Sequence, residues 1–93
     1  MISENVLMVI AGDIEKLLLE KQEAISDSYT KIQEGIKISL GINLDHSSKG
    51  VVVNYSLSFP LEPQPKSPLK ATVKLTHTIN EAQSEMFEGG ING

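Results

Sequence analysis

The sequence predicts an α+β domain in which a long N-terminal helix, continuous or broken, packs on a three-stranded antiparallel β-meander in the order αβββ. Residues 3–35 contain no proline and space their apolar residues as a helix does. Residues 36–59 alternate apolar and polar side chains around a polar turn, and residues 69–79 alternate again after a proline-rich loop. Residues 1–80 are expected to form this domain, and residues 81–93 an acidic C-terminal tail that is either a short helix or disordered.

Length and composition narrow the class of protein. A chain of 93 residues builds one small core of marginal size, for which oligomer formation is a common remedy. There is no cysteine, which excludes disulfides, thiolate metal sites and a cysteine nucleophile. Neither a signal sequence nor a bilayer-spanning segment is recognisable, so we expect a cytoplasmic protein without membrane contact.

Charge is divided along the chain. Residues 1–35 carry seven acids and three lysines, residues 36–79 two acids and five lysines, and residues 80–93 three acids. The sheet region is therefore mildly basic between acidic flanks. All eight basic residues are lysine, and the lack of arginine argues against bidentate recognition of phosphate or guanine.

The N-terminal helix is expected to begin after an N-cap at Ser3 and to end near Gly35, which suits a C′ position. At about 100° per residue, one narrow apolar stripe runs along its whole length and predicts the face that lies on the sheet. Its members are Leu7, Ala11, Ile14, Leu18, Ile25, Tyr29 and Ile32.

A second set of apolar residues covers the rest of the circumference in the first half of this helix, which predicts a second partner surface and a homo-oligomer. The set is Val6, Met8, Val9, Ile10, Leu17 and Leu19. About 32 helical residues would also span nearly 50 Å, well beyond a strand of about 30 Å. The helix is therefore expected either to overhang as an oligomerisation arm or to break, at Gly12-Asp13 or at Ser26–Ser28.

The best-defined element is a β-hairpin over residues 36–59. Its polar turn, residues 45–50, predicts a register that pairs Leu44 with Val51 and Ile36 with Phe59. All four prolines lie in residues 60–68, which excludes helix and central strand there. The hairpin and the strand over residues 69–79 should each present one apolar and one polar face.

The tail contains Gln83-Ser84-Glu85-Met86-Phe87. This segment resembles the Gln-x-x-[Leu/Met]-Phe peptides with which bacterial replication and repair proteins bind the sliding clamp. The resemblance implies that Gln83 forms hydrogen bonds at one small pocket while Met86 and Phe87 fill another. A different interpretation is that Asn80 and Gln83 form a capping box, and that Met86 and Phe87 lie on a short helix against the chain's own core.

The polar face of the sheet carries Lys37, Lys70 and Lys74 among serine, threonine and asparagine. It could bind single-stranded nucleic acid, but such sites combine cations with aromatic stacking platforms, and the outward positions contain no aromatic residue. A solvated face, or a protein-binding surface that includes strand addition at an exposed edge, is the favoured interpretation.

Catalytic and metal-binding patterns are sparse. Asp45, His46 and His77 are expected at one end of the sheet, where two imidazoles and a carboxylate could hold a metal, although no spacing fixes them and His77 suits a strand-end core position. No nucleophile elbow, phosphate loop or carboxylate pair is recognisable, so we expect neither a cofactor nor enzymatic activity.

In overall style the chain is similar to small phage or prophage proteins encoded among replication, recombination or anti-defence genes. We expect a non-enzymatic interaction protein that self-associates through the N-terminal helix. Such a protein would bind, and by occlusion inhibit, a host replication or defence protein through the sheet surface or the tail, with the sliding clamp as one candidate. The alternative is a single-stranded nucleic-acid or nucleotide-binding accessory protein that uses Lys37, Lys70 and Lys74.

Overall fold

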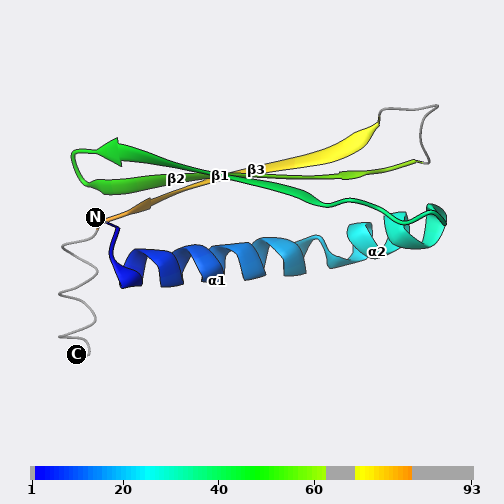
Figure 1. Ribbon diagram of the computed structural model, residues 1–93, viewed down its shortest axis with the longest axis horizontal. Helices are drawn as coiled ribbons and strands as arrows, with labels where there is room; N and C mark the ends of the chain where they lie inside the picture. Colours follow the sequence, from blue (N-terminus) through cyan, green and yellow to red (C-terminus); the bar gives the residue numbers. More distant parts are fainter. Residues whose placement is uncertain (1, 63–68, 81–93) are drawn as a thin grey trace.

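In the computed structural model the described residues form two layers, with both of their helices on one face of a single sheet (Figure 1). The structure describes residues 2–62 and 69–80. The described part measures 52 × 25 × 16 Å along its principal axes. The αβββ order is confirmed, with α1 (Glu4–Glu20), α2 (Gln22–Lys31), β1 (Ser39–Ser47), β2 (Gly50–Pro60) and β3 (Lys70–Ile79).

The helical region starts where the sequence predicts and breaks where it does not. Ser3 Oγ accepts a hydrogen bond from the amide of Val6 at 3.2 Å, as an N-cap should. The break falls at Lys21, between α1 and α2, so the break points expected at Gly12-Asp13 and at Ser26–Ser28 were wrong. Gly35 is also not a C′ residue, since α2 already ends at Lys31 and Gly35 adopts its φ of +101° in the following turn.

The sheet is an antiparallel meander in the order β1-β2-β3, but the expected hairpin register is wrong by two residues. Leu44 lies opposite Val53 because only Ser48 and Lys49 separate the strands, so the turn is shorter than predicted. A shift of two residues keeps each side chain on its face, and the predicted apolar and polar faces therefore survive. Gly50 closes the turn at a φ of +144°, where a Cβ atom would collide with the Ile79 carbonyl.

The core lies between α1 and the central strand. Alternate residues of β2 are buried, and Val53, Tyr55 and Leu57 are at most 2 % exposed. The predicted stripe is only partly buried: Ile32 is buried and Ile14 and Leu18 pack against the core, but Leu7, Ala11 and Tyr29 are exposed. The buried positions of α1 are Val6, Ile10 and Leu17, so this helix is rotated by about a quarter turn from the expected orientation.

Candidate functional site

A row of large aliphatic side chains lies uncovered along β1. These residues face the helix layer, because they alternate along the strand and lie opposite buried residues of β2. Each is between 37 % and 43 % exposed, and no residue of β1 belongs to the core. We call this row the β1 face; it consists of Ile38, just before the strand, and Leu40, Ile42 and Leu44.

The β1 face is open because α1 is anchored towards the other edge of the sheet. Asp13 of α1 accepts a hydrogen bond from the hydroxyl of Tyr55 on β2, with 2.5 Å between the oxygens. The same carboxylate oxygen lies 2.7 Å from Nδ1 of His77 on β3. A single aspartate thus links α1 to β2 and β3, and no comparable contact to β1 is found in the described residues.

Helix geometry shows which residues lie on the side of α1 that faces away from Asp13. At about 100° per residue, Asp13 lies on one side of the buried Val6, Ile10 and Leu17, and a second group of apolar residues lies on the other. Because Asp13 points towards β3, that second group borders β1. We call it the α1 flank: Leu7 and Ala11, both exposed, with the half-buried Ile14 and Leu18.

The contacts of Asp13 suit anchoring better than catalysis. Burial, the hydrogen bond to Asp13 and the charge of Asp13 all raise the pKa of Tyr55 well above its ordinary value, which keeps the phenol protonated as a donor. The carboxylate also lies within hydrogen-bond distance of Nδ1 of His77, the pairing found in general-base sites. However, neither Asp13 nor His77 lines any of the three pockets described in this structure.

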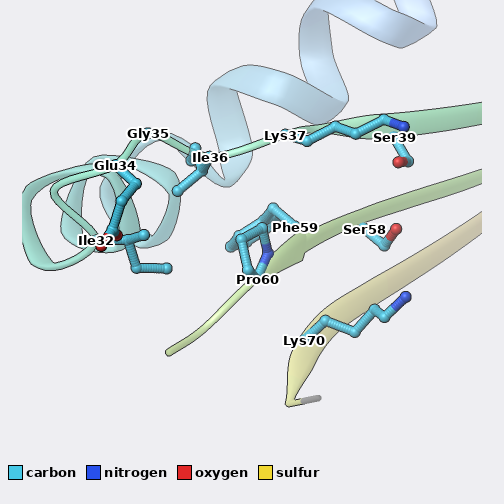
Figure 2. A pocket seen from close by; sticks show the side chains of 10 residues that line it. All are labelled: Ile32, Glu34, Gly35, Ile36, Lys37, Ser39, Ser58, Phe59, Pro60 and Lys70. Atoms are coloured by element: carbon cyan, nitrogen blue, oxygen red, sulfur yellow. The ribbon is translucent and has the colours of Figure 1, made fainter. Parts of the chain in front are cut away.

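An open pocket of about 700 Å³ lies at the end of the sheet remote from the hairpin turn. It forms because β1 joins the sheet only at Ser39. Phe59 and Pro60 of β2 therefore pair with β3 but have no partner on the β1 side. Figure 2 shows the side chains of Lys37 and Lys70 extending along the sheet, away from Ile32 and Glu34. Neither ammonium group therefore points towards the part of the pocket that Ile32 and Glu34 line.

On the polar face, side-chain hydrogen bonds connect all three strands. Asp45 of β1 accepts hydrogen bonds from Asn43 and from Asn54 of β2, and Asn54 accepts one from Thr76 of β3 at 2.7 Å. Lys74 borders a shallow hollow over these residues, away from the pocket that Lys37 and Lys70 share. The three lysines predicted to bind nucleic acid are therefore not gathered into one site, and that function stays a prediction.

The residues predicted to form an oligomer interface separate into two groups. Val6, Ile10 and Leu17 lie in the chain's own core, where they are at most 8 % exposed, and Val9 packs against it. Met8 and Leu19 are 65 % and 61 % exposed, so the interface stays a prediction for these two.

Two further sets of predicted site residues are not assembled in the described structure. Gln83, Met86 and Phe87 lie outside the described residues. His46 and His77 lie on different edge strands with β2 between them, and Asp45 occupies the opposite face. Residues 2–62 and 69–80 contain no group of three or more potential metal ligands.

The sequence interpretation missed Asp13 as an anchor and the uncovered state of β1. The sequence does contain a signal for the Asp13 anchor, because an aspartate inside an apolar helix needs a buried partner. Tyr55 and His77, both expected on the apolar face of the sheet, are the polar residues able to supply it. The uncovered state of β1 can be inferred only when the position of the helix over the sheet is known.

Comparison with protein-family models, with curated proteins and with solved structures returns no match for this chain. Within the described residues, neither α1 nor α2 combines the length and the hydropathy needed to cross a membrane.

Proposed function

We propose that this chain is a non-enzymatic interaction protein whose β1 face binds another protein. One observation carries the proposal: four large aliphatic residues lie uncovered in a row beside the apolar α1 flank. Continuous exposed apolar patches on small proteins mark interaction surfaces, since keeping them in water is unfavourable. The free edge of β1 adds unpaired backbone groups, which a partner strand can satisfy.

The resemblance of the chain to small phage proteins suggests a host protein as the partner. Occlusion of that protein requires only a complementary surface, so the proposal assigns no catalytic residue. The rigidity of the hairpin supports this role, because β1 is held to β2 along its whole length and its polar face is joined by the Asp45 hydrogen bonds.

Quantitative affinity capture from extract of the encoding cell, with two matched variants, tests the proposal. Ile42→Lys places a charge on the β1 face, whereas Leu75→Lys places one on β3. Both residues lie opposite Tyr55, and they are 43 % and 39 % exposed. For proteins that bind the β1 face, the amount captured by Ile42→Lys should be about tenfold or more lower than with the unmodified chain. The amount captured by Leu75→Lys should be unchanged. Equal capture by both variants and the unmodified chain would remove the β1 face as a binding surface.

A further inference from the structure

We infer that the protein bound at the β1 face is a second copy of this chain rather than a host protein, and that its own β1 pairs antiparallel with the first across a two-fold axis. The two sheets then become one continuous sheet with α1 and α2 of both copies on the same face. This inference rests on the proposed function, because it names the partner of the same surface. It differs from the helix-mediated oligomer that the sequence predicts, since the strand edge makes the primary contact.

The two edges of the sheet differ in how well they are protected from such pairing. Edge strands are commonly protected by lysine, by proline or by a covering element. β3 carries Lys70 and Lys74 and is tied to α1 through His77. β1 has no lysine or proline between Ser39 and Ser47, and every one of its nine residues is exposed. The open edge for a second copy is therefore β1.

The residue pattern of β1 selects one register. With the two-fold axis at Gly41, Leu40 of one copy lies opposite Ile42 of the other, and Ile38 opposite Leu44. The polar face then sets Lys37 opposite Asp45, which joins opposite charges. An axis at Ile42 would instead place Ile38 opposite His46, and an axis at Asn43 would place Lys37 opposite Lys49. Only the axis at Gly41 pairs every member of the β1 face with another and also matches the charges.

The helices fit the same arrangement. In the joined sheet, the two β2 strands are three strand spacings apart, about 14 Å, and packed helices lie about 8–10 Å apart. Two helices that each cover β2 would therefore meet above the paired β1 strands after a small inward tilt. The surfaces that meet are the two α1 flanks, running antiparallel.

The α1 flank is self-complementary in this geometry. Asp13 contacts Tyr55, which lies opposite Ile42 and so next to the proposed axis. The helices then cross near residues 12 and 13, which brings Leu7 of one copy towards Leu18 of the other, and Ala11 towards Ile14. The 54 % exposure of Leu7 in the single chain is accounted for by this contact.

Sedimentation analysis of the full chain over a range of micromolar concentrations tests the dimer. We expect a reversible dimer whose dissociation constant rises by about 100-fold or more in Ile42→Lys, because each dimer would bury two unpaired ammonium groups. Leu75→Lys is the matched control and should dimerise like the unmodified chain. Circular dichroism and thermal unfolding establish that both variants are folded.

Cysteine cross-linking tests the register, because the chain has no cysteine of its own. Gly41→Cys is tolerated, since a Cβ there has ordinary contact with the Ser56 carbonyl at 4.0 Å. With the axis at Gly41, the two introduced cysteines, one in each copy, face each other at a separation that a disulfide spans. Two Asn43→Cys residues would instead lie about 13 Å apart. Oxidation should give a covalent dimer for Gly41→Cys and not for Asn43→Cys; the reverse result would overturn the register.

The outcomes separate this inference from the proposed function. A monomer at high micromolar concentration, with capture of other proteins still sensitive to Ile42→Lys, would overturn the dimer and leave the β1 face as a binding surface. Equal behaviour of Ile42→Lys and Leu75→Lys in both sedimentation and capture would overturn both.

Discussion

The two edge strands, β1 and β3, flank the same central strand and alternate apolar and polar residues in the same way, yet only one of them is integrated into the core. On β3, Ile79 is 3 % exposed and Val73 packs on the core, although Leu75 is 39 % exposed. All nine residues of β1 are exposed. A helix is about 10 Å wide, and three strands extend over about 14 Å with their side chains. A single helix therefore cannot cover both edges, and one polar anchor, Asp13, decides which edge stays open.

The difference also shows how a half-buried polar group directs packing. Apolar contacts are not directional, and several rotations of α1 would bury similar area. The Asp13 carboxylate has to meet a donor, and Tyr55 and His77 lie on β2 and β3. Satisfying it displaces α1 from β1, so the open apolar surface is a consequence of the anchor.

The largest expected effect is on the free energy of unfolding, and it is tested by replacing one isoleucine on each edge strand. Ile79→Ala should lower the free energy of unfolding by about 3 kcal/mol, because it leaves a cavity in the core. Ile42→Ala should cost less than about 1 kcal/mol at concentrations where the chain is monomeric, since Ile42 is 43 % exposed. Urea unfolding measures both values, and equal losses would contradict the contrast between β1 and β3.

A smaller loss is expected when the anchor is removed. Asp13→Ala leaves the hydroxyl of the buried Tyr55 without its acceptor, which should cost about 2 kcal/mol in urea unfolding. Glu15→Ala, an exposed position two residues along the same helix, is the control and should change stability by less than about 0.5 kcal/mol. A loss for Asp13→Ala no larger than that of the control would show that the anchor does not hold α1.

The alkaline limit of stability should depend on the same anchor. Tyr55 has a raised pKa in the folded chain, and an unfolded tyrosine loses its proton near a pKa of about 10. The contribution of the Tyr55 phenol to the free energy of unfolding is fully present below about pH 10. It is lost as the pH rises above this value, because only the unfolded chain then releases the proton. The loss should approach about 1.4 kcal/mol per pH unit.

Urea unfolding at a series of alkaline pH values measures this dependence. Tyr55→Phe should have a shallower decline than the unmodified chain, while Tyr29→Phe, which removes a phenol that is 66 % exposed, should keep the full decline. Identical slopes for the two variants would mean that Tyr55 does not cause the dependence.

The smallest effect on the sheet is expected from deleting residues 81–93. The strand that precedes them, β3, is not the strand at the dimer edge, and we expect sedimentation to give an unchanged dimer. The resemblance of the tail to clamp-binding peptides predicts binding to a purified sliding clamp, which the deletion should abolish, as should combined replacement of Gln83, Met86 and Phe87 by alanine. Clamp binding that survives both changes would eliminate the tail motif, and a weakened dimer would contradict the separation of the two edges.

Local pattern predicted a large part of the fold. The alternation of residues 36–59 and 69–79 predicted three strands and the correct face for each side chain, and Ser3 predicted the start of α1. The two-residue error in the hairpin register left those faces intact, because side chains alternate with a period of two. The break at Lys21 carries no glycine, proline or capping residue and was accordingly missed.

What the sequence by itself determined, then, is the order of the elements and the apolar face of each strand, since both follow from periodicity and turn residues. Tertiary structure alone decided which side of α1 is buried, which edge of the sheet is covered and where the uncovered apolar surface lies. The physical reason is the range of the contacts: Asp13 is 42 residues from Tyr55 and 64 from His77, and no local pattern encodes hydrogen bonds over that separation.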